Sequence, residues 1–156
     1  MIEANQSINL DFSVQLADGG EKRTCRMADL IRRPTIVSVY MRNNTSNCDK
    51  QVQQMQVAAK ELDKLGYDLI GLSKDTPGSH LKYACKLELS FPLVSDPEHL
   101  FAKATDSLVE KKMYGKTFLG PTRSAYLIDP EGKVLAVLEK VDSARHAEQL
   151  RELVER

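Results

Sequence analysis

The chain has 156 residues, and its 22 Lys plus Arg balance 22 Asp plus Glu, so the formal net charge is zero. A balanced charge argues against a nucleic-acid or membrane-surface partner recognised by bulk electrostatics. Hydrophobic residues make up 42% of the chain, as in an ordinary globular protein. At this length we expect one domain, residues 1–156, that buries about 70% of its unfolded surface.

The chain has three cysteines, Cys25, Cys48 and Cys85. This number is small and odd, which argues against a disulfide scaffold. No two of them have C-x-x-C spacing, which excludes that type of dithiol and most zinc sites. The N-terminal MIEANQSINLDF lacks the basic and apolar segments of a signal peptide, and no apolar stretch approaches the ~20 residues of a membrane span. We therefore expect a cytoplasmic protein in a reducing compartment, with no metal and no other cofactor.

The first third of the chain has strand patterns. FSVQLA (12–17) alternates, meets the turn signal DGG (18–20) and continues into KRTCRM (22–27), which predicts an N-terminal β-hairpin. TIVSVYM (35–41) is apolar and β-branched and predicts a buried central strand.

A helix is predicted from Cys48 to Leu65, because apolar residues recur there at three- and four-residue spacing. The expected inner face is Val52, Met55, Ala58, Ala59, Leu62 and Leu65. Gly66 fits the end of this helix. YDLIGLS (67–73) then predicts a second buried strand, which makes a βαβ unit with the first.

A further helix is predicted after residue 75, with Asp75, Thr76 and Ser79 as capping candidates. FPLVSDP (91–97) predicts a short strand that ends at a Pro-bearing turn. EHLFAKAT (98–105) predicts a short helix. Residues 106–122 form the least regular part of the pattern.

The C-terminal part begins with SAYLIDPEGKVLAVLE (124–139), which predicts a β-hairpin around Asp129-Pro130-Glu131-Gly132. Residues 143–156 predict an amphipathic helix. We expect Ser143 as its N-cap, Leu150, Leu153 and Val154 on its inner face, and Glu148–Arg151 and Glu152–Arg156 as surface pairs. The order of elements predicts an α/β chain with a thioredoxin-like fold, a mixed central sheet flanked by helices.

Cys48 falls in the first turn of the helix that follows the central strand. A helix N-terminus offers unpaired N–H groups and the positive end of the helix dipole, which stabilise a thiolate. Such sites lower a thiol pKa from about 8.5 to roughly 3.5–7.5. The neighbouring Asp49 acts in the opposite direction. The position thus suits a reactive thiol, although a thiol that merely caps the helix or fills the loop would fit the same spacing.

Three stretches, in the right order, resemble one family. TSNC (45–48) resembles the T-x-x-C half of the peroxiredoxin signature P-x-x-x-T-x-x-C. SKDTPGSHLKYACKLELSFPLVSD (73–96) and YGKTFLGPTRSAYLIDPEGKV (114–134) resemble segments of the peroxiredoxin Q, or bacterioferritin comigratory protein, subfamily. The resemblance extends from about residue 9 to the C-terminus.

The resemblance implies a peroxidase that uses thiol chemistry alone, without metal, haem or flavin. Cys48 would be the peroxidatic cysteine, whose thiolate attacks hydrogen peroxide or an organic hydroperoxide and becomes a sulfenic acid. Thr45 would hydrogen-bond the sulfur and the incoming peroxide, and Arg123 would bring a guanidinium over the sulfur. From the residues alone, Arg123 would instead be read as a surface cation at a strand edge.

Two positions depart from the family pattern. Met41 stands where the signature has Pro, which restores a backbone N–H and allows more freedom over the pocket. Gln51 stands where an acidic residue is often found, which removes a proton shuttle from that position.

The second thiol of the reaction is open at this stage. Some subfamily members resolve the sulfenic acid with a Cys five residues after the peroxidatic one, where this chain has Gln53. Others use a Cys in the next helix, which implies Cys85 as the resolving thiol, although Cys85 would also suit a small buried residue packed with Leu81 and Ala84. Thioredoxin or a related dithiol would reduce the product, and an outside thiol would act directly if Cys85 does not resolve. Cys25 is interpreted as structural.

The remaining candidates are weaker. His80 begins a predicted helix and is interpreted as a capping group, and the three histidines have no metal-ligand spacing. A phosphatase would need an Arg six residues after Cys48, where Gln54 stands. Besides the peroxidase, a thioredoxin-fold binding or chaperone protein with a degenerate site stays open, and Met41 favours it. The subfamily resemblance implies a monomer.

Overall fold

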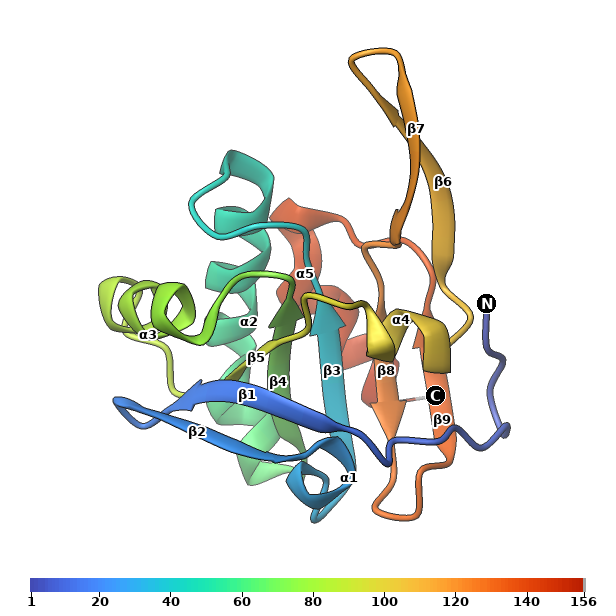
Figure 1. Ribbon diagram of the computed structural model, residues 1–156. Coiled ribbons are helices and arrows are strands. Elements are labelled where there is room, and N and C mark those ends of the chain that lie inside the picture. Colours follow the sequence, from blue (N-terminus) through green and yellow to red (C-terminus); the bar gives the residue numbers. More distant parts are fainter. Residues whose placement is uncertain (156) are drawn as a thin grey trace.

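A computed structural model describes residues 1–155 (Figure 1). The strands of the main sheet are β1 (Ser13–Asp18), β2 (Glu21–Arg26), β3 (Thr35–Val39), β4 (Asp68–Ser73), β5 (Leu93–Ser95), β8 (Ala125–Ile128) and β9 (Val134–Leu138). The helices are α1 (Met27–Leu30), α2 (Ser46–Lys64), α3 (Pro77–Lys86), α4 (Leu100–Ala104) and α5 (His146–Val154), with a 3₁₀ turn at Ser143–Arg145.

The seven strands lie in the order β2-β1-β5-β4-β3-β8-β9, so the sheet is mixed. β3, β4 and β5 run parallel at its centre, while the N-terminal hairpin and the β8–β9 hairpin add antiparallel strands on either side. The parallel strands need crossovers, which α2 and α3 provide. The predicted thioredoxin-like fold, with its N-terminal β-hairpin, is confirmed.

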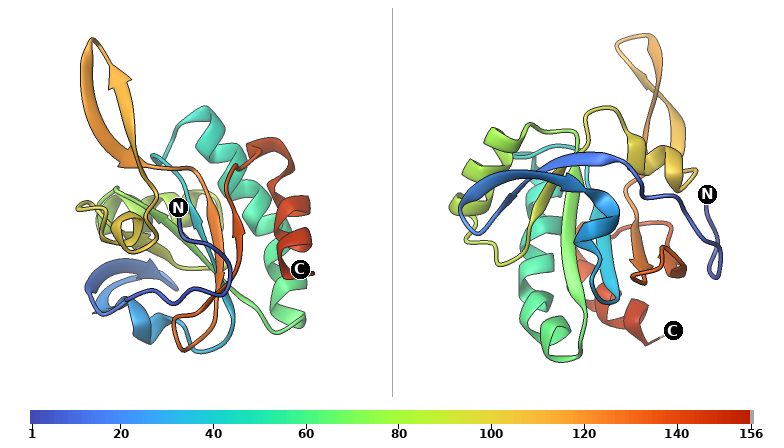
Figure 2. Two further views of the ribbon diagram at one scale, coloured as in Figure 1. Left: turned by 90° about the vertical axis from the view of Figure 1, so that its right-hand side faces the viewer. Right: turned by 60° about the horizontal axis from the view of Figure 1, so that its bottom comes forward.

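Two apolar layers cover the sheet, one on each face (Figure 2). Alternate residues of β3 belong to different layers: Ile36 packs with α2 and α5, whereas Val37 packs with α1 and α4. All five residues of β3 are buried, as expected for a central strand. No helix within residues 1–155 is long and apolar enough to cross a membrane.

Residues 106–122, expected to be irregular, instead form an antiparallel hairpin of β6 (Leu108–Met113) and β7 (Lys116–Pro121) that projects from the body (Figures 1 and 2). Its turn places Tyr114 and Gly115 at φ +54° and +75°, the pair of positive angles that a two-residue hairpin turn needs. The prediction was wrong because the arm is largely exposed on both sides, so no apolar alternation marks its strands.

The predicted helix 48–65 is confirmed as α2, which begins two residues earlier. Gly66 ends it with φ +93°, in the left-handed region that glycine favours. Leu65, expected on the inner face, is 59% exposed because the helix is already ending there.

The C-terminal helix differs in its cap and its ion pairs. Asp142, not Ser143, accepts a hydrogen bond from the backbone of Ala144, so the chain enters through a 3₁₀ turn before α5. The expected Glu148–Arg151 pair is replaced by two others: Arg145 pairs with Glu148 and Arg151 with Glu61 of α2. The expected Glu152–Arg156 pair lies outside the described residues.

Candidate active site

Cys48 is the third residue of α2, directly after the connection that leaves the end of β3. Thr45 is the N-cap residue, with extended backbone angles, and its side chain caps no backbone N–H of the helix. The predicted position of Cys48 in the first turn is therefore confirmed. Its side chain is only 1% exposed and packs within the apolar layer under α2 and α5.

Burial alone would raise the pKa of Cys48, because a thiolate loses hydration in an apolar setting. Hydrogen bonds from Thr45 and from the backbone of Arg42 and Met41, together with the charge of Arg123, outweigh that cost and lower the pKa below its ordinary value. The site thus favours a thiolate although Cys48 is almost fully buried.

The Thr45 hydroxyl can form hydrogen bonds with two groups, the carbonyl oxygen of Arg42 and the sulfur of Cys48. It donates to the carbonyl oxygen of Arg42 at 2.9 Å, and it also lies within hydrogen-bond reach of the Cys48 sulfur. A hydroxyl has one proton and two acceptor positions. It can therefore accept from a protonated partner while donating to Arg42, or turn and donate to the thiolate.

Arg123 comes from the segment before β8, the strand next to β3 in the sheet. β8 pairs with β3 so that Ser38 lies opposite Ala125, and the carbonyl of Ser124 accepts from Val39 at 2.8 Å. Arg123 therefore lies just before β8, beside the end of β3 where the Cys48 loop begins. Its Nη1 donates to Gln51 Oε1 at 2.7 Å.

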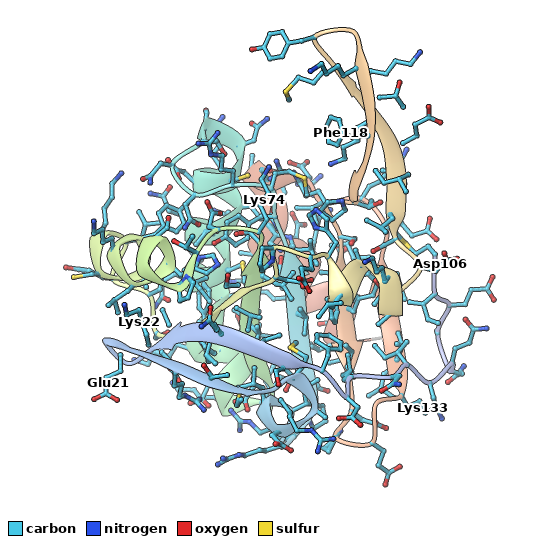
Figure 3. The ribbon with its side chains drawn as sticks, viewed as in Figure 1. Glu21, Lys22, Lys74, Asp106, Phe118 and Lys133 are labelled. Carbon is cyan, nitrogen blue, oxygen red and sulfur yellow. The ribbon has the colours of Figure 1, made fainter. Side chains whose placement is uncertain are left out.

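Met41, the departure from the signature proline, is half-buried and is contacted by the projecting hairpin. Lys111 Nζ lies 3.1 Å from the Met41 sulfur. Burial lowers the pKa of Lys111, the charges of Arg123 and Lys74 lower it further, and Cys48 raises it. Figure 3 shows Lys74 at the end of the body from which the hairpin extends. Lys111 therefore links Met41 to the charges of Arg123 and Cys48.

The loop before α2 is anchored to α3 and β5 by buried polar groups. Asn43 is buried; its backbone N–H donates to Asp75 at 2.9 Å, and its side chain lies 3.1 Å from His80 Nδ1. His80 Nε2 lies 3.0 Å from the carbonyl oxygen of Val94. The interpretation of His80 as a capping group was wrong: Thr76 caps α3, and His80 is a fully buried bridge.

Cys85 occupies a different environment in the last turn of α3. It is exposed, so the alternative of a small buried residue was wrong. Two contacts tie this helix to the Cys48 loop: Tyr83 Oη donates to Asp49 Oδ1 at 2.5 Å, and Lys86 Nζ donates to Asn44 at 2.9 Å. Both cysteines are free thiols.

The remaining candidates lie away from this site. Cys25 is half-buried in β2, and burial raises its pKa. Within residues 1–155, no cluster of three or more His, Cys, Asp or Glu residues could hold a metal. Sequence patterns missed Ser38, which accepts a hydrogen bond from Gln51, and His146, which lies 2.8 Å from Ser38. The available signal was a serine inside an otherwise apolar buried strand.

A buried thiol at a helix start, whose thiolate form is favoured by hydrogen bonds and by the charge of Arg123, on a thioredoxin-like fold, is the arrangement of a thiol-dependent peroxidase. Residues 7–137 match the model of the AhpC/TSA family, and the chain belongs to that family. Its relatives include peroxiredoxin Bcp of Xanthomonas campestris pv. campestris, 36% identical over 113 residues that cover 72% of this chain and 71% of the relative. A putative peroxiredoxin of Mycobacterium tuberculosis is 31% identical over 140 residues, 90% of this chain and 87% of that protein.

Solved structures agree with this assignment. The chain is similar to the Xanthomonas campestris bacterioferritin comigratory protein, in a study of its alkyl peroxide reduction activity, with TM-score 0.85, 28% identity and 98% of both chains covered. It is equally similar to a cysteine-to-serine mutant of Xanthomonas campestris peroxiredoxin Q, with TM-score 0.86, 28% identity and 98% of this chain and 97% of that chain covered.

Proposed function

We propose that residues 1–156 form a single-domain peroxidase that reduces hydrogen peroxide and organic hydroperoxides through Cys48. The observation that carries this proposal is the burial of Cys48 in the first turn of α2, directly after the N-cap residue Thr45 and with Arg123 just before β8, which pairs with β3. Although burial raises the pKa of this thiol, hydrogen bonds from Thr45 and two backbone groups and the charge of Arg123 lower it below its ordinary value. A thiolate is the nucleophilic form of cysteine. A packing residue would gain nothing from a pKa lowered against the cost of burial.

In the first step the Cys48 thiolate attacks one peroxide oxygen. The sulfur–oxygen bond forms, the oxygen–oxygen bond breaks, and the leaving oxygen takes a proton and departs as water or an alcohol. Cys48 is oxidised to a sulfenic acid and the peroxide is reduced. Arg123 stabilises the charge that moves onto the departing oxygen, and Thr45 orients the peroxide by donating and accepting.

In the second step we assign Cys85 as the resolving thiol. Its sulfur attacks the Cys48 sulfenic acid, a disulfide forms, and water leaves. Because Cys48 is buried and Cys85 is exposed, the first turn of α2 and the end of α3 must open locally before the two sulfurs meet. The Tyr83–Asp49 and Lys86–Asn44 contacts are those that would break.

The partners follow from this chemistry. Thioredoxin or a similar dithiol would reduce the disulfide, in a cytoplasmic setting where dithiol reductants are kept reduced. We expect a monomer without nucleic-acid, membrane, metal or other cofactor partners. Among the basic residues between positions 22 and 33, Arg23, Arg26 and Arg33 are each paired with carboxylates.

A second candidate is a thioredoxin-fold binding or chaperone protein in which the thiol no longer turns over. Met41 in place of the signature proline favours it. Its contact with Lys111 supports the peroxidase instead, because Lys111 also interacts electrostatically with Cys48.

The test is a peptide map of the reduced protein after one equivalent of hydrogen peroxide, without reductant. A crosslinked Cys48–Cys85 peptide would support the full two-cysteine cycle. Oxygen added to Cys48 without a crosslink would support the first step and overturn the role of Cys85. An unmodified Cys48 would overturn the peroxidase and leave the binding protein.

A further inference from the structure

A chain of buried hydrogen bonds runs from Arg123 away from the thiol and into the core. Arg123 Nη1 donates to Gln51 Oε1 at 2.7 Å, and Gln51 Nε2 donates to Ser38 Oγ at 2.9 Å and to the carbonyl of Val39 at 3.1 Å. Ser38 Oγ lies 2.8 Å from His146 Nε2. The chain thus joins α2, β3 and the first residue of α5.

These polar groups lie in an otherwise apolar layer. Gln51, Ser38 and His146 are each 0% exposed, and Ser38 points to the same side of β3 as Ile36, toward α2 and α5. A buried polar group without a partner is costly, so such groups persist only in satisfied networks. A fold that needed packing alone would place apolar side chains here.

The donors and acceptors can be ordered from the far end. Burial lowers the pKa of His146 to about 4, so the imidazole is neutral and has one N–H. Gln149 Oε1, 3.1 Å from Nδ1, can only accept, which places the proton on Nδ1 and leaves Nε2 as an acceptor. Nε2 therefore takes the Ser38 proton, and Ser38 Oγ turns its lone pairs toward Gln51.

This order decides which end of the Gln51 amide faces Arg123. With Ser38 Oγ and the carbonyl of Val39 both accepting, the Gln51 NH₂ group points inward and its oxygen points at the guanidinium. The opposite rotamer would direct two N–H donors at a cation. Within residues 1–155, the Arg123 side chain makes its one hydrogen bond to Gln51, so the amide orientation controls the placement of the charge.

We propose that Ser38 and His146 are positioning residues, which orient the neutral Gln51 amide and through it hold the Arg123 guanidinium beside the end of β3, where the Cys48 loop begins. This inference rests on the proposed function, because it assigns a support to the same site. It also gives α5, far from the thiol in sequence, a direct influence on its reactivity. Since Gln51 is neutral, Arg123 keeps its whole positive charge for the thiolate and the peroxide.

The test uses two substitutions in a Cys25→Ser, Cys85→Ser background, in which Cys48 is the single thiol. His146→Leu removes the acceptor at similar size, and Ser38→Ala removes the relay hydroxyl. We expect each to raise the pKa of Cys48, measured by ultraviolet thiolate absorbance, and to slow oxidation by hydrogen peroxide about tenfold, as for groups that orient a catalytic residue.

Two controls separate positioning from packing. His146→Gln keeps an acceptor and a donor at the end of the side chain and is expected to restore most of the rate and the pKa of Cys48. Leu153→Val loosens the same helix without touching the hydrogen bonds and is expected to leave the pKa of Cys48 unchanged. If Leu153→Val raises that pKa as much as His146→Leu does, the effect is packing and the proposal is overturned.

A double-mutant cycle completes the test. If His146 acts through Arg123, then His146→Leu adds little to Arg123→Met, whereas independent effects multiply. Multiplied effects, or an unchanged pKa of Cys48 in both relay variants, overturn the positioning role. A parent whose Cys48 has a lowered pKa yet resists peroxide would instead overturn the peroxidase function, since the titration tests the positioning without any turnover.

Discussion

Two free thiols of this chain lie at opposite ends of two neighbouring helices, and their surroundings are opposite. Cys48 lies at the start of α2, 1% exposed, where unpaired backbone N–H groups and the positive end of the dipole favour a thiolate. Cys85 lies in the last turn of α3, exposed, at the end where carbonyl groups predominate. Cys48 thus lies where a negative charge is stabilised, whereas Cys85 lies where other molecules can reach the sulfur.

The comparison separates two requirements of the proposed cycle. Reaction with peroxide needs a thiolate and hydrogen-bond donors that point toward the reacting atoms. The start of α2 provides both. Reduction of the sulfenic acid needs an exposed thiol that can reach Cys48 after local opening. Cys85 at the end of α3 provides such a thiol. Neither position would serve the other purpose.

The largest effect is expected from removing each of the two thiols in turn. Cys48→Ser should abolish peroxide turnover, because serine at this position is not ionised, whereas Cys85→Ser should leave the first oxidation intact and block the disulfide. Turnover with a thioredoxin system and single-turnover peroxide consumption measure the two steps separately. Turnover of Cys48→Ser at the parent rate would contradict the account, and parent-rate cycling of Cys85→Ser would make Cys85 structural.

The next largest effect concerns Arg123, whose charge favours the Cys48 thiolate. Arg123→Met should slow the reaction with hydrogen peroxide about 100-fold, as the loss of one aimed donor does in other enzymes. The charge of Arg123 lowers the pKa of Cys48, so the pH at which the rate reaches half its maximum should rise. Stopped-flow rates across pH check both changes. Arg32→Met, an exposed arginine on another face, is the matched control.

Acid should weaken the layer beneath Cys48. The pKa of His146 is about 4 in the folded protein and near 6.5 when unfolded, so its contribution is fully present above pH 6.5 and is lost as pH falls to 4. The loss amounts to about 3 kcal/mol at most. His146→Gln should remove this part of the acid sensitivity, measured by urea unfolding at pH 7 and pH 4.5. Parallel pH curves for parent and variant would contradict the prediction.

The smallest effect concerns the link between the two thiol regions. Tyr83→Phe removes the hydrogen bond to Asp49, which stabilises the closed arrangement by about 1 kcal/mol. Disulfide formation after oxidation should therefore speed up about fivefold. Tyr114→Phe, at a residue that is 96% exposed in the turn of the hairpin, should leave the rate of disulfide formation unchanged. An unchanged rate in Tyr83→Phe would mean that opening does not depend on this contact.

The sequence was informative where a pattern repeats over several residues. The run TIVSVYM and the three- and four-residue spacing after Cys48 predicted β3 and α2, since burial on a strand or helix face imposes those periods. The exposed β6–β7 arm has no such burial, so its strands left no periodic signal and the segment was expected to be irregular.

The site divided in the same way. Cys48, Thr45 and Arg123 came from motifs, and the structure brings all three to the end of β3. Ser38 and His146 are 108 residues apart, and only the packing of α5 against the sheet joins them. His80 shows the converse: its place at a helix start suggested a cap, whereas its burial depends on Asn43 and on β5.

The central claim is that the surroundings of Cys48, and not exposure, decide which thiol meets peroxide. The most direct measurement is single-turnover oxidation across pH, quenched early and resolved by peptide mass. The account predicts oxygen or a crosslink first on Cys48, with half-maximal rate below the ordinary thiol pKa of about 8.5. Oxidation that begins on the exposed Cys85, or a Cys48 rate that rises only above that pH, would contradict it.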